Sequence, residues 1–482
     1  MNLRIVKYII GWILVFEAAF LLFPVIAGLF YKEYRHCIVY IVTALLSLLS
    51  GFFLTRREKL DISDQIYIRE GFAAVSLSWI VLSIVGALPF VFTGEIPNLI
   101  DALFETASGF TTTGASILSD VEALSRTSLF WRSFTHWIGG MGIFVFIMAV
   151  LPMTGARSLN LIRAESPGPT VGKFVPKLRQ SSLLLYFLYI LLTIIGLICF
   201  MLSGMPVFDA FTMIFGTMGT GGFGIYNDSA ASFTPLQQNL ITVFMILGGI
   251  NYSVYFCIIS GNFRQILSFE EVRWYLLIIM ASTIIITCDI LNMFGSAVTA
   301  LRHAAFQVAS IITTSGFSTV DFDRWPGLSR NIIVVLMIIG ACAGSTGGGF
   351  KVSRVLILIK SVSKEIHSII HPQRIKKLYL DKMSLSEETI RSVSAYTAVY
   401  IVIIIASCML IAPDELDFTT NFTAVLATVN NIGPGLSLVG PSHNFDVYSY
   451  FSKCVLIFDM IAGRLELFPI LILFSPSCWR KY

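Results

Sequence analysis

Long apolar runs dominate this sequence and restrict the environments in which it can fold. Several reach the roughly 18 to 20 residues that cross a bilayer as a helix. Only 13% of the 482 residues are charged, against roughly 25% in a soluble domain. The sequence therefore predicts an all-α integral membrane protein with ten spanning helices, near residues 5–31, 36–54, 71–93, 127–152, 181–203, 236–261, 273–295, 331–362, 393–412 and 450–475.

The charges between these runs predict the orientation of the chain. Residues 154–180 and 351–382 are rich in Lys and Arg, whereas residues 94–124, 204–234 and 413–449 carry acids and neither Lys nor Arg. Because basic loops stay in the cytoplasm, the first two segments are predicted to be cytoplasmic and the acidic segments to face outward. Residues 296–330 are mixed and are placed outside by alternation. This order puts both termini in the cytoplasm.

The four outward segments form an internal repeat. They read "DALFETASGFTTTG", "DAFTMIFGTMGTGG", "HAAFQVASIITTSG" and "TNFTAVLATVNNIG", and they align without a gap on their final glycine. The position six before that glycine is always small, and the position two before it is always Thr or Asn. We therefore expect two N-terminal transmembrane helices in residues 1–56 and four helix–pore-loop–helix units around a central pore, in residues 68–156, 175–262, 270–365 and 388–477.

Each unit is expected to send a short helix and a glycine-containing stretch into the membrane from outside. Irregular backbone at that depth must be buried in protein or line water, and its carbonyl groups can replace the hydration shell of a cation. The stretches before the four glycines are uncharged, which suits a monovalent ion. The predicted ion-binding residues are Thr112, Thr113, Gly114, Thr220, Gly221, Gly222, Thr314, Ser315, Gly316, Asn431, Ile432 and Gly433.

Acidic residues near these stretches have two interpretations. They can raise the local cation concentration at the mouth of a pore, or they can stabilise the N-terminal ends of the short helices. The sequence leaves both open for Asp101, Asp209, Asp228 and Asp417.

A second glycine-rich stretch interrupts the apolar run at residues 331–362. "GSTGGGFKVS" has the glycine spacing of a phosphate loop, but Phe350 precedes Lys351 and Val352 follows it, so the nucleotide-binding pattern is broken. Since glycine is unfavourable inside a helix, we interpret the stretch as an intramembrane gate; a kink for helix packing is the alternative. The predicted gate residues are Gly344, Ser345, Thr346, Gly347, Gly348, Gly349, Lys351 and Arg464.

Arg464 lies in an apolar run, where a charged side chain faces a cavity or a partner by default. We expect it to line the pore and hold the gate through carbonyl or hydroxyl groups. The alternative is a structural ion pair with Asp459 or Glu466.

Several motifs, in this order, resemble the TrkH/KtrB/HKT superfamily of potassium transport proteins. They include the pore-loop sequences "TTTGAS", "GTMGTGGFG", "TTSGFST" and "NNIGPG", together with "WIGGMGIFVF", "FMILGGINYS", "GACAGSTGGGFKVSR" and "AGRLELF". The resemblance covers nearly the whole chain. The two extra N-terminal spans are similar to the TrkH type.

The resemblance implies potassium uptake through a central pore in the bacterial inner membrane. It also implies a homodimer and a cytosolic TrkA-like regulatory ring that binds nucleotides, with no cofactor in this chain and potassium as its substrate. In some relatives a serine replaces the first filter glycine and sodium transport increases; this chain keeps Gly114. The fourth unit departs from the others at Asn430 and Pro434, so fourfold symmetry is approximate.

Other functions find less support in the sequence. It contains no GxSxG, HExxH or paired metal-ligand spacing, so we expect no enzyme, and we expect no nucleic acid as a partner. A symporter that couples potassium to protons or sodium, and a less selective monovalent cation channel, remain alternatives. The basic residues 361–384 are expected to bind anionic lipid or to dock the regulatory ring.

Overall fold

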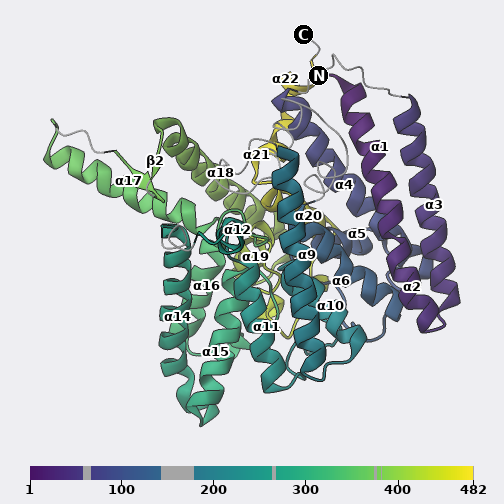
Figure 1. Ribbon diagram of the computed structural model, residues 1–482, viewed down its shortest axis with the longest axis horizontal. Coiled ribbons are helices and arrows are strands. Elements are labelled where there is room, and N and C mark those ends of the chain that lie inside the picture. Colours follow the sequence, from purple (N-terminus) through teal and green to yellow (C-terminus); the bar gives the residue numbers. More distant parts are fainter. Residues whose placement is uncertain (58–66, 143–177, 263–267, 374–376, 382, 481–482) are drawn as a thin grey trace.

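A computed structural model describes residues 1–57, 67–142, 178–262, 268–373, 377–381 and 383–480 (Figure 1). In these residues the fold is helical, with one short antiparallel hairpin of β1 (Tyr379–Leu380) and β2 (Met383–Ser384). Residues 143–156 and 175–177, which belong to the first and second predicted units, lie outside the described residues. Most of the basic segment 154–180 lies outside them as well.

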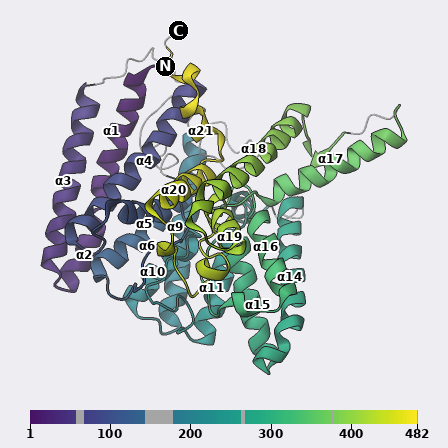
Figure 2. The same ribbon diagram turned by 180° about the vertical axis from the view of Figure 1, so that it is seen from behind.

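Two N-terminal elements precede the four units and lie together at one side of the molecule (Figures 1 and 2). The first is the bent helix pair α1 (Leu3–Phe20) and α2 (Leu22–Phe30), and the second is α3 (Tyr34–Arg57). Small residues allow α1 and α3 to approach closely, as is common between membrane helices. A Cβ added to Gly51 would lie 2.6 Å from the carbonyl oxygen of Gly11.

Each of the four units begins with a long helix, continues with a short one and ends with a helix that breaks. The long helices are α4 (Ile68–Thr93), α9 (Leu178–Leu202), α14 (Glu270–Phe294) and α18 (Glu387–Ile411). The short ones are α5 (Leu99–Phe110), α10 (Val207–Met218), α15 (Ala297–Ile312) and α19 (Phe418–Val429). The third helices are α6 (Arg126–Met141), α11 (Pro235–Gly248), α16 (Gly327–Ile339) and α20 (Tyr450–Arg464).

Further helices follow three of these third helices. They are α12 (Tyr252–Ile259), the protruding α17 (Val352–Ile370), α21 (Phe468–Leu471) and α22 (Pro476–Trp479). Single 3₁₀ turns lie at Phe322–Arg324, Ala412–Asp414, Ser437–Val439, Phe445–Val447 and Ile472–Phe474.

The prediction of ten spanning helices was wrong for the third helices of units 2 and 4, which break, whereas the break within 331–362 was predicted; in unit 1, residues 143–152 of the predicted span lie outside the described residues. Six helices among the described residues are long and apolar enough to span a membrane, or seven if α11 and α12, which bend by 92°, count as one span. The helices α6 and α16 end at glycines with positive φ, Gly142 and Gly340, and α20 is followed by Glu466 and Leu467, also with positive φ. A left-handed residue cannot continue a right-handed helix.

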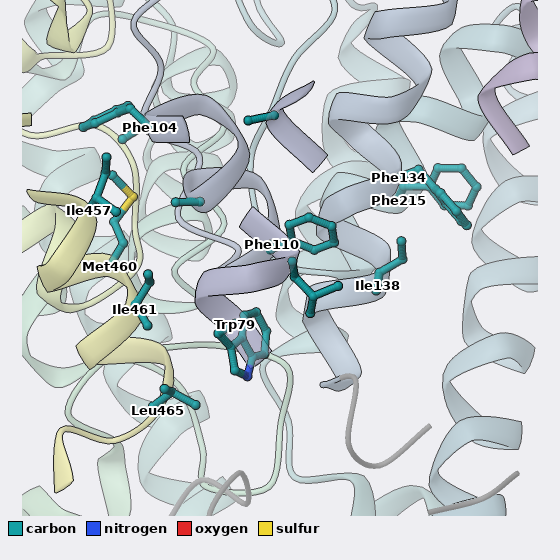
Figure 3. Close-up of a cluster of buried hydrophobic side chains, with 14 of the residues drawn as sticks. Trp79, Phe104, Phe110, Phe134, Ile138, Phe215, Ile457, Met460, Ile461 and Leu465 are labelled. Carbon is teal, nitrogen blue, oxygen red and sulfur yellow. The ribbon is translucent and has the colours of Figure 1, made fainter. Parts of the chain in front are cut away.

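A cluster of buried apolar side chains packs behind the short helices (Figure 3). Phe110 at the end of α5 packs edge-on against Trp131 of α6, and Phe134 of α6 packs against Phe215 of α10. Met460 and Ile461 of α20 belong to the same cluster. Because close-packed interiors resist displacement, this packing fixes the ends of the short helices relative to one another.

Candidate ion pathway

The four short helices end in the same conformation. Each one stops four residues before its aligned glycine, at Phe110, Met218, Ile312 and Val429. The residue two before the glycine is left-handed in every unit, with φ of 56° at Thr112, 53° at Thr220, 59° at Thr314 and 55° at Asn431. A Thr in this conformation costs about 1 kcal/mol, and such strain clusters at functional sites.

Hydrogen bonds explain why the spacing between the small residue and the glycine recurs in all four units. The N–H of the residue just before the glycine donates to the carbonyl six residues before the glycine, which is the 6→1 bond of a Schellman helix end. The four bonds are Thr113 to Ser108 at 2.9 Å, and Gly221 to Gly216, Ser315 to Ser310 and Ile432 to Ala427 at 2.8 Å. The small residues identified from the sequence are therefore the acceptors of the bond that closes each helix. The one in unit 2 is also tightly packed, since a Cβ on Gly216 would lie 2.8 Å from the Phe317 ring.

The four glycines close a ring. A Cβ added to Gly114 would lie 2.0 Å from the Gly221 carbonyl oxygen, and one on Gly222 would lie 1.8 Å from that of Ser315. A Cβ added to Gly316 would lie 2.2 Å from the Ile432 carbonyl oxygen, and one on Gly433 would lie 2.8 Å from that of Thr113. Each unit therefore abuts the next in the order one, two, three, four, one, and the twelve predicted filter residues lie together around one axis.

A depression lined by all four units opens above this ring. Its lining includes Gly114, Gly222, Gly316 and Gly433. The seven predicted filter residues with fully buried side chains are Thr112, Thr113, Thr220, Thr314, Ser315, Asn431 and Ile432. Because glycine has no side chain, the four glycines contribute only backbone polar groups to this lining.

The acidic residues that the sequence suggested for the pore entrance form hydrogen bonds or ion pairs within the protein. The N-cap of α19, Asp417, accepts a hydrogen bond from the N–H of Thr420. Asp101 pairs with Lys453 at 2.7 Å, and Asp209 accepts a hydrogen bond from the Tyr226 hydroxyl. These contacts support the helix-end interpretation for Asp417, while Asp101 and Asp209 also bind side chains of other segments.

Apart from Arg464, which ends α20, the predicted gate residues lie in the loop between α16 and α17, and the two ends of this loop lie close together. The N–H of Lys351 donates to the carbonyl of Ile339 at 2.9 Å, which brings the end of α16 to the start of α17. The loop between them lies against the ring, because the N–H of Gly348 donates to the Thr314 hydroxyl at 2.6 Å. The Thr346 hydroxyl donates to the carbonyl of Gly248 in unit 2 at 3.0 Å.

Two basic side chains, those of Lys351 and Arg464, donate hydrogen bonds to carbonyl groups of this loop. Lys351 donates from Nζ to the carbonyl of Gly347. Arg464 donates to the carbonyl of Thr346 at 3.0 Å and to those of Gly139 and Gly140 in unit 1.

Both carboxylates proposed as alternative partners of Arg464 have partners elsewhere. Glu466 pairs with Arg354, and Asp459 accepts a hydrogen bond from Ser407 at 2.7 Å. Arg464 therefore joins the loop of unit 3 to units 1 and 4.

Sequence reasoning missed one residue that contacts the loop. One carboxylate oxygen of Glu271, in the first turn of α14, accepts hydrogen bonds from the N–H of Ala343 at 2.7 Å and of Ser353 at 3.0 Å. The side chain is buried. An acid at the edge of an apolar run was the available signal, but it resembles an ordinary helix-start acid.

Four units with pore loops that meet on one axis, preceded by two N-terminal transmembrane elements, define a multi-pass membrane transport protein with a central pore. The predicted fold class is confirmed. The chain matches the TrkH family, described as cation transport protein, over residues 37–481, and it belongs to that family. Since this is a transport family, the prediction that the chain is not an enzyme is also confirmed.

Similar proteins cover the full length of the chain. It is 36% identical to the Trk system potassium uptake protein TrkH of Salmonella typhimurium and 35% identical to that of Escherichia coli K12, with 100% of each chain covered. The crystal structure of the potassium transporter TrkH from Vibrio parahaemolyticus matches with a TM-score of 0.88 and 30% identity, again over 100% of both chains.

Proposed function

We propose that the protein takes up potassium across the bacterial inner membrane through the central pore. The observation that carries this proposal is the ring of close contacts between Gly114, Gly222, Gly316, Gly433 and the backbone of the neighbouring units. An uncharged ring of carbonyl groups suits a monovalent cation that exchanges water for backbone oxygen. The names of the relatives, which are potassium uptake proteins, support potassium as that ion.

The loop of residues 344–349 acts as the gate in this proposal. It lies beside the ring, and its carbonyl groups are held by Lys351 and Arg464. Opening requires these hydrogen bonds to break, because the loop is otherwise closed against units 2 and 3. The positive charge of Arg464 also opposes cation passage until the side chain moves.

The orientation and the partners complete the proposal. Both termini lie in the cytoplasm, the functional form is a homodimer, and a cytosolic TrkA-like ring that binds nucleotides regulates the gate. Membrane lipids surround the exposed apolar side chains of α3 and α14, such as Leu49 and Met280. Potassium is the substrate, and the chain needs no cofactor of its own.

Rubidium uptake by a bacterial strain that lacks its own potassium transporters tests the central claim. The strain carrying this gene is expected to accumulate rubidium, and a Gly114→Ser variant, whose added Cβ would lie 2.0 Å from the Gly221 carbonyl oxygen, is expected to accumulate much less. Membrane-inserted protein that gives no rubidium uptake above the empty vector contradicts the proposal.

The pore and symporter mechanisms are distinguished in proteoliposomes. A pore dissipates a potassium gradient without a second ion and shows single-channel currents. A symporter requires protons or sodium for potassium movement. The closed ring of four segments supports the pore, since all four predicted re-entrant segments begin on the same side. Equal potassium and sodium currents indicate the less selective channel.

A further inference from the structure

Unit 1 differs from the other three in the helix that packs behind the ring. The third helices align on Gly139, Gly248, Gly340 and Gly463. Three positions earlier, unit 1 has His136 where the other units have Met245, Met337 and Met460, and all four side chains are fully buried. Seven positions earlier, unit 1 has the buried Arg132 where the others have Ile241, Ile333 and Leu456. The fourfold pattern is thus broken by two polar side chains.

Arg132 connects the segments that follow the filter glycines of units 1 and 2. Its Nε pairs with Oε1 of Glu105 at 2.5 Å, and another guanidinium nitrogen donates to the carbonyl of Gly224 at 2.7 Å. The guanidinium also lies 3.6 Å from the centre of the Phe223 ring. A charged group this well buried requires such pairing.

Glu105 ties the same pair to unit 1. Its carboxylate accepts hydrogen bonds from the Ser116 hydroxyl at 3.0 and 3.1 Å and from the N–H of Ile117 at 3.1 Å. The equivalent positions, nine before each filter glycine, are Met213, Gln307 and Ala424.

His136 contacts unit 2 directly at the filter. Its Nε2 lies 3.1 Å from the backbone nitrogen of Phe223, and its Nδ1 lies 2.7 Å from the carbonyl oxygen of Gly109. A backbone N–H only donates, so Nε2 accepts and Nδ1 carries the proton of a neutral ring. A Cβ added to Gly221 would lie 2.2 Å from this ring, so the imidazole is also the wall against which the filter segment packs.

The segment held by these contacts is the one that most needs support. Residues 219–224 read "GTGGFG", and glycine loses more conformational freedom on folding than any other residue. Discrimination between cations by a carbonyl ring depends on the position and stiffness of its oxygens. Contacts that hold Phe223 and Gly224, immediately after Gly222, therefore affect the position and stiffness of the carbonyl oxygens in this segment.

We propose that Glu105, Arg132 and His136 form a clamp that fixes the filter segment of unit 2 to unit 1 and thereby sets the preference for potassium over sodium. All three are positioning residues, since they act on the ion through the backbone of residues 221–224. The inference rests on the proposed function, because it concerns the selectivity of the same pore.

The other units supply matched replacements for the test. His136→Met introduces the residue that the other three units carry. Glu105→Met combined with Arg132→Ile gives unit 1 the pair of unit 2, Met213 and Ile241, and removes both charges together. His136→Gln keeps one donor and one acceptor, and Met337→Leu changes the equivalent position of unit 3 as a control.

The measurement is the sodium-to-potassium permeability ratio, from reversal potentials of purified protein in planar bilayers, with melting temperatures recorded in detergent. His136→Met and the double variant are expected to raise the ratio about tenfold, and His136→Gln and Met337→Leu to leave it within about twofold of the unchanged protein. A melting temperature that stays within about 3 °C separates this effect from general destabilisation.

The outcomes separate the two proposals. If the unchanged protein does not prefer potassium, the proposed function fails. If it does, and either clamp variant conducts with an unchanged ratio, the clamp is overturned. If His136→Met does not fold, the double variant decides: a raised ratio supports the clamp, and an unchanged ratio or loss of the folded protein in this variant too assigns these residues to folding instead.

Discussion

The outer and inner halves of the pathway are built on different principles. In the outer ring, all four units share a left-handed residue at the same position, the same helix-closing bond and the same kind of glycine contact. In the inner half one loop comes from unit 3, its arginine comes from unit 4, and the carbonyl groups of Gly139 and Gly140 come from unit 1. The ring is thus set by repeated backbone geometry, whereas the loop is held by individual side chains.

This contrast predicts opposite mutational effects. A change in the ring displaces a neighbouring backbone and should abolish transport. A change in the loop contacts releases a closed state and should increase transport. Position in the pathway, rather than residue type, is expected to decide the sign.

The largest effect is expected for filter glycines. Gly222→Ala places a methyl group 1.8 Å from the Ser315 oxygen, and because the obstacle is backbone, rubidium uptake should fall by about a hundredfold or more. Gly433→Ala, with 2.8 Å to the Thr113 oxygen, should retain more activity.

Gly94→Ala is the matched control, because Gly94 also has positive φ, 82°, but no atom lies within 4 Å of its added Cβ. It carries the backbone strain without the clash. If it lowers uptake as much as Gly222→Ala, strain rather than ring contact is responsible, and the predicted ranking is wrong.

The second effect has the opposite sign. Arg464→Ala removes the hydrogen bonds to Gly139 and Gly140 of unit 1 and the bond to Thr346, which is the one that holds the loop. Potassium efflux from proteoliposomes should therefore rise about tenfold, the change that the loss of one charge-assisted hydrogen bond produces. Arg464→Lys should give a smaller rise, since Lys lacks the planar fork. Arg324→Ala, at an exposed arginine in an ion pair with Asp321, serves as the control. Unchanged efflux in folded Arg464→Ala protein contradicts the gate.

A smaller increase is expected at Glu271. Glu271→Gln keeps an acceptor oxygen for the N–H groups of Ala343 and Ser353 but loses the negative charge. The potassium flux should therefore rise about threefold, which corresponds to about half the free energy of the tenfold rise expected for Arg464→Ala. Glu270→Gln is the neighbouring control, because its carboxylate pairs with Lys360 instead of the loop. If the two substitutions change the flux equally, the effect comes from the loss of negative charge in this region and not from the contact of Glu271 with the loop.

The repeated outer ring could be predicted from the sequence, whereas the contacts of the inner loop could be predicted only in part. The gapless repeat predicted four pore loops because a backbone motif such as the Schellman end needs the same residue classes at the same spacing each time. The loop contacts of Arg464 were expected from an arginine in an apolar run.

The contacts of Glu271, and those of His136 with Phe223, joined residues 72 and 87 positions apart. Nothing in either local sequence specified such partners. The breaks after α11 and α20 were missed for the same reason. Hydropathy measures the apolar character of a segment, which continues through the break, while the backbone turns at residues whose conformation depends on the packed neighbour.

The smallest effect concerns stability at the N-terminal end of α19, away from the ring. The hydroxyl of Thr420 donates to Asp417 and lowers the pKa of this carboxyl below its ordinary value, and the N–H of Thr420 adds a bond at 3.0 Å. Since the folded-state pKa is depressed, the contribution is present at neutral pH and is lost as the pH falls through the folded-state pKa. Asp417→Ala should therefore destabilise α19 by about 1 kcal/mol at pH 7, the typical value of a helix cap.

Thermal unfolding in detergent at pH 7 and near pH 3 measures this difference, with Glu365→Ala on the exposed part of α17 as the control. The gap in melting temperature between Asp417→Ala and the unchanged protein should shrink at the lower pH, while potassium selectivity stays the same, because the cap lies at the far end of the helix from the ring. A gap that persists at low pH means that Asp417 stabilises through packing rather than charge. A change in selectivity means that even the outer ends of the short helices determine the geometry of the ring.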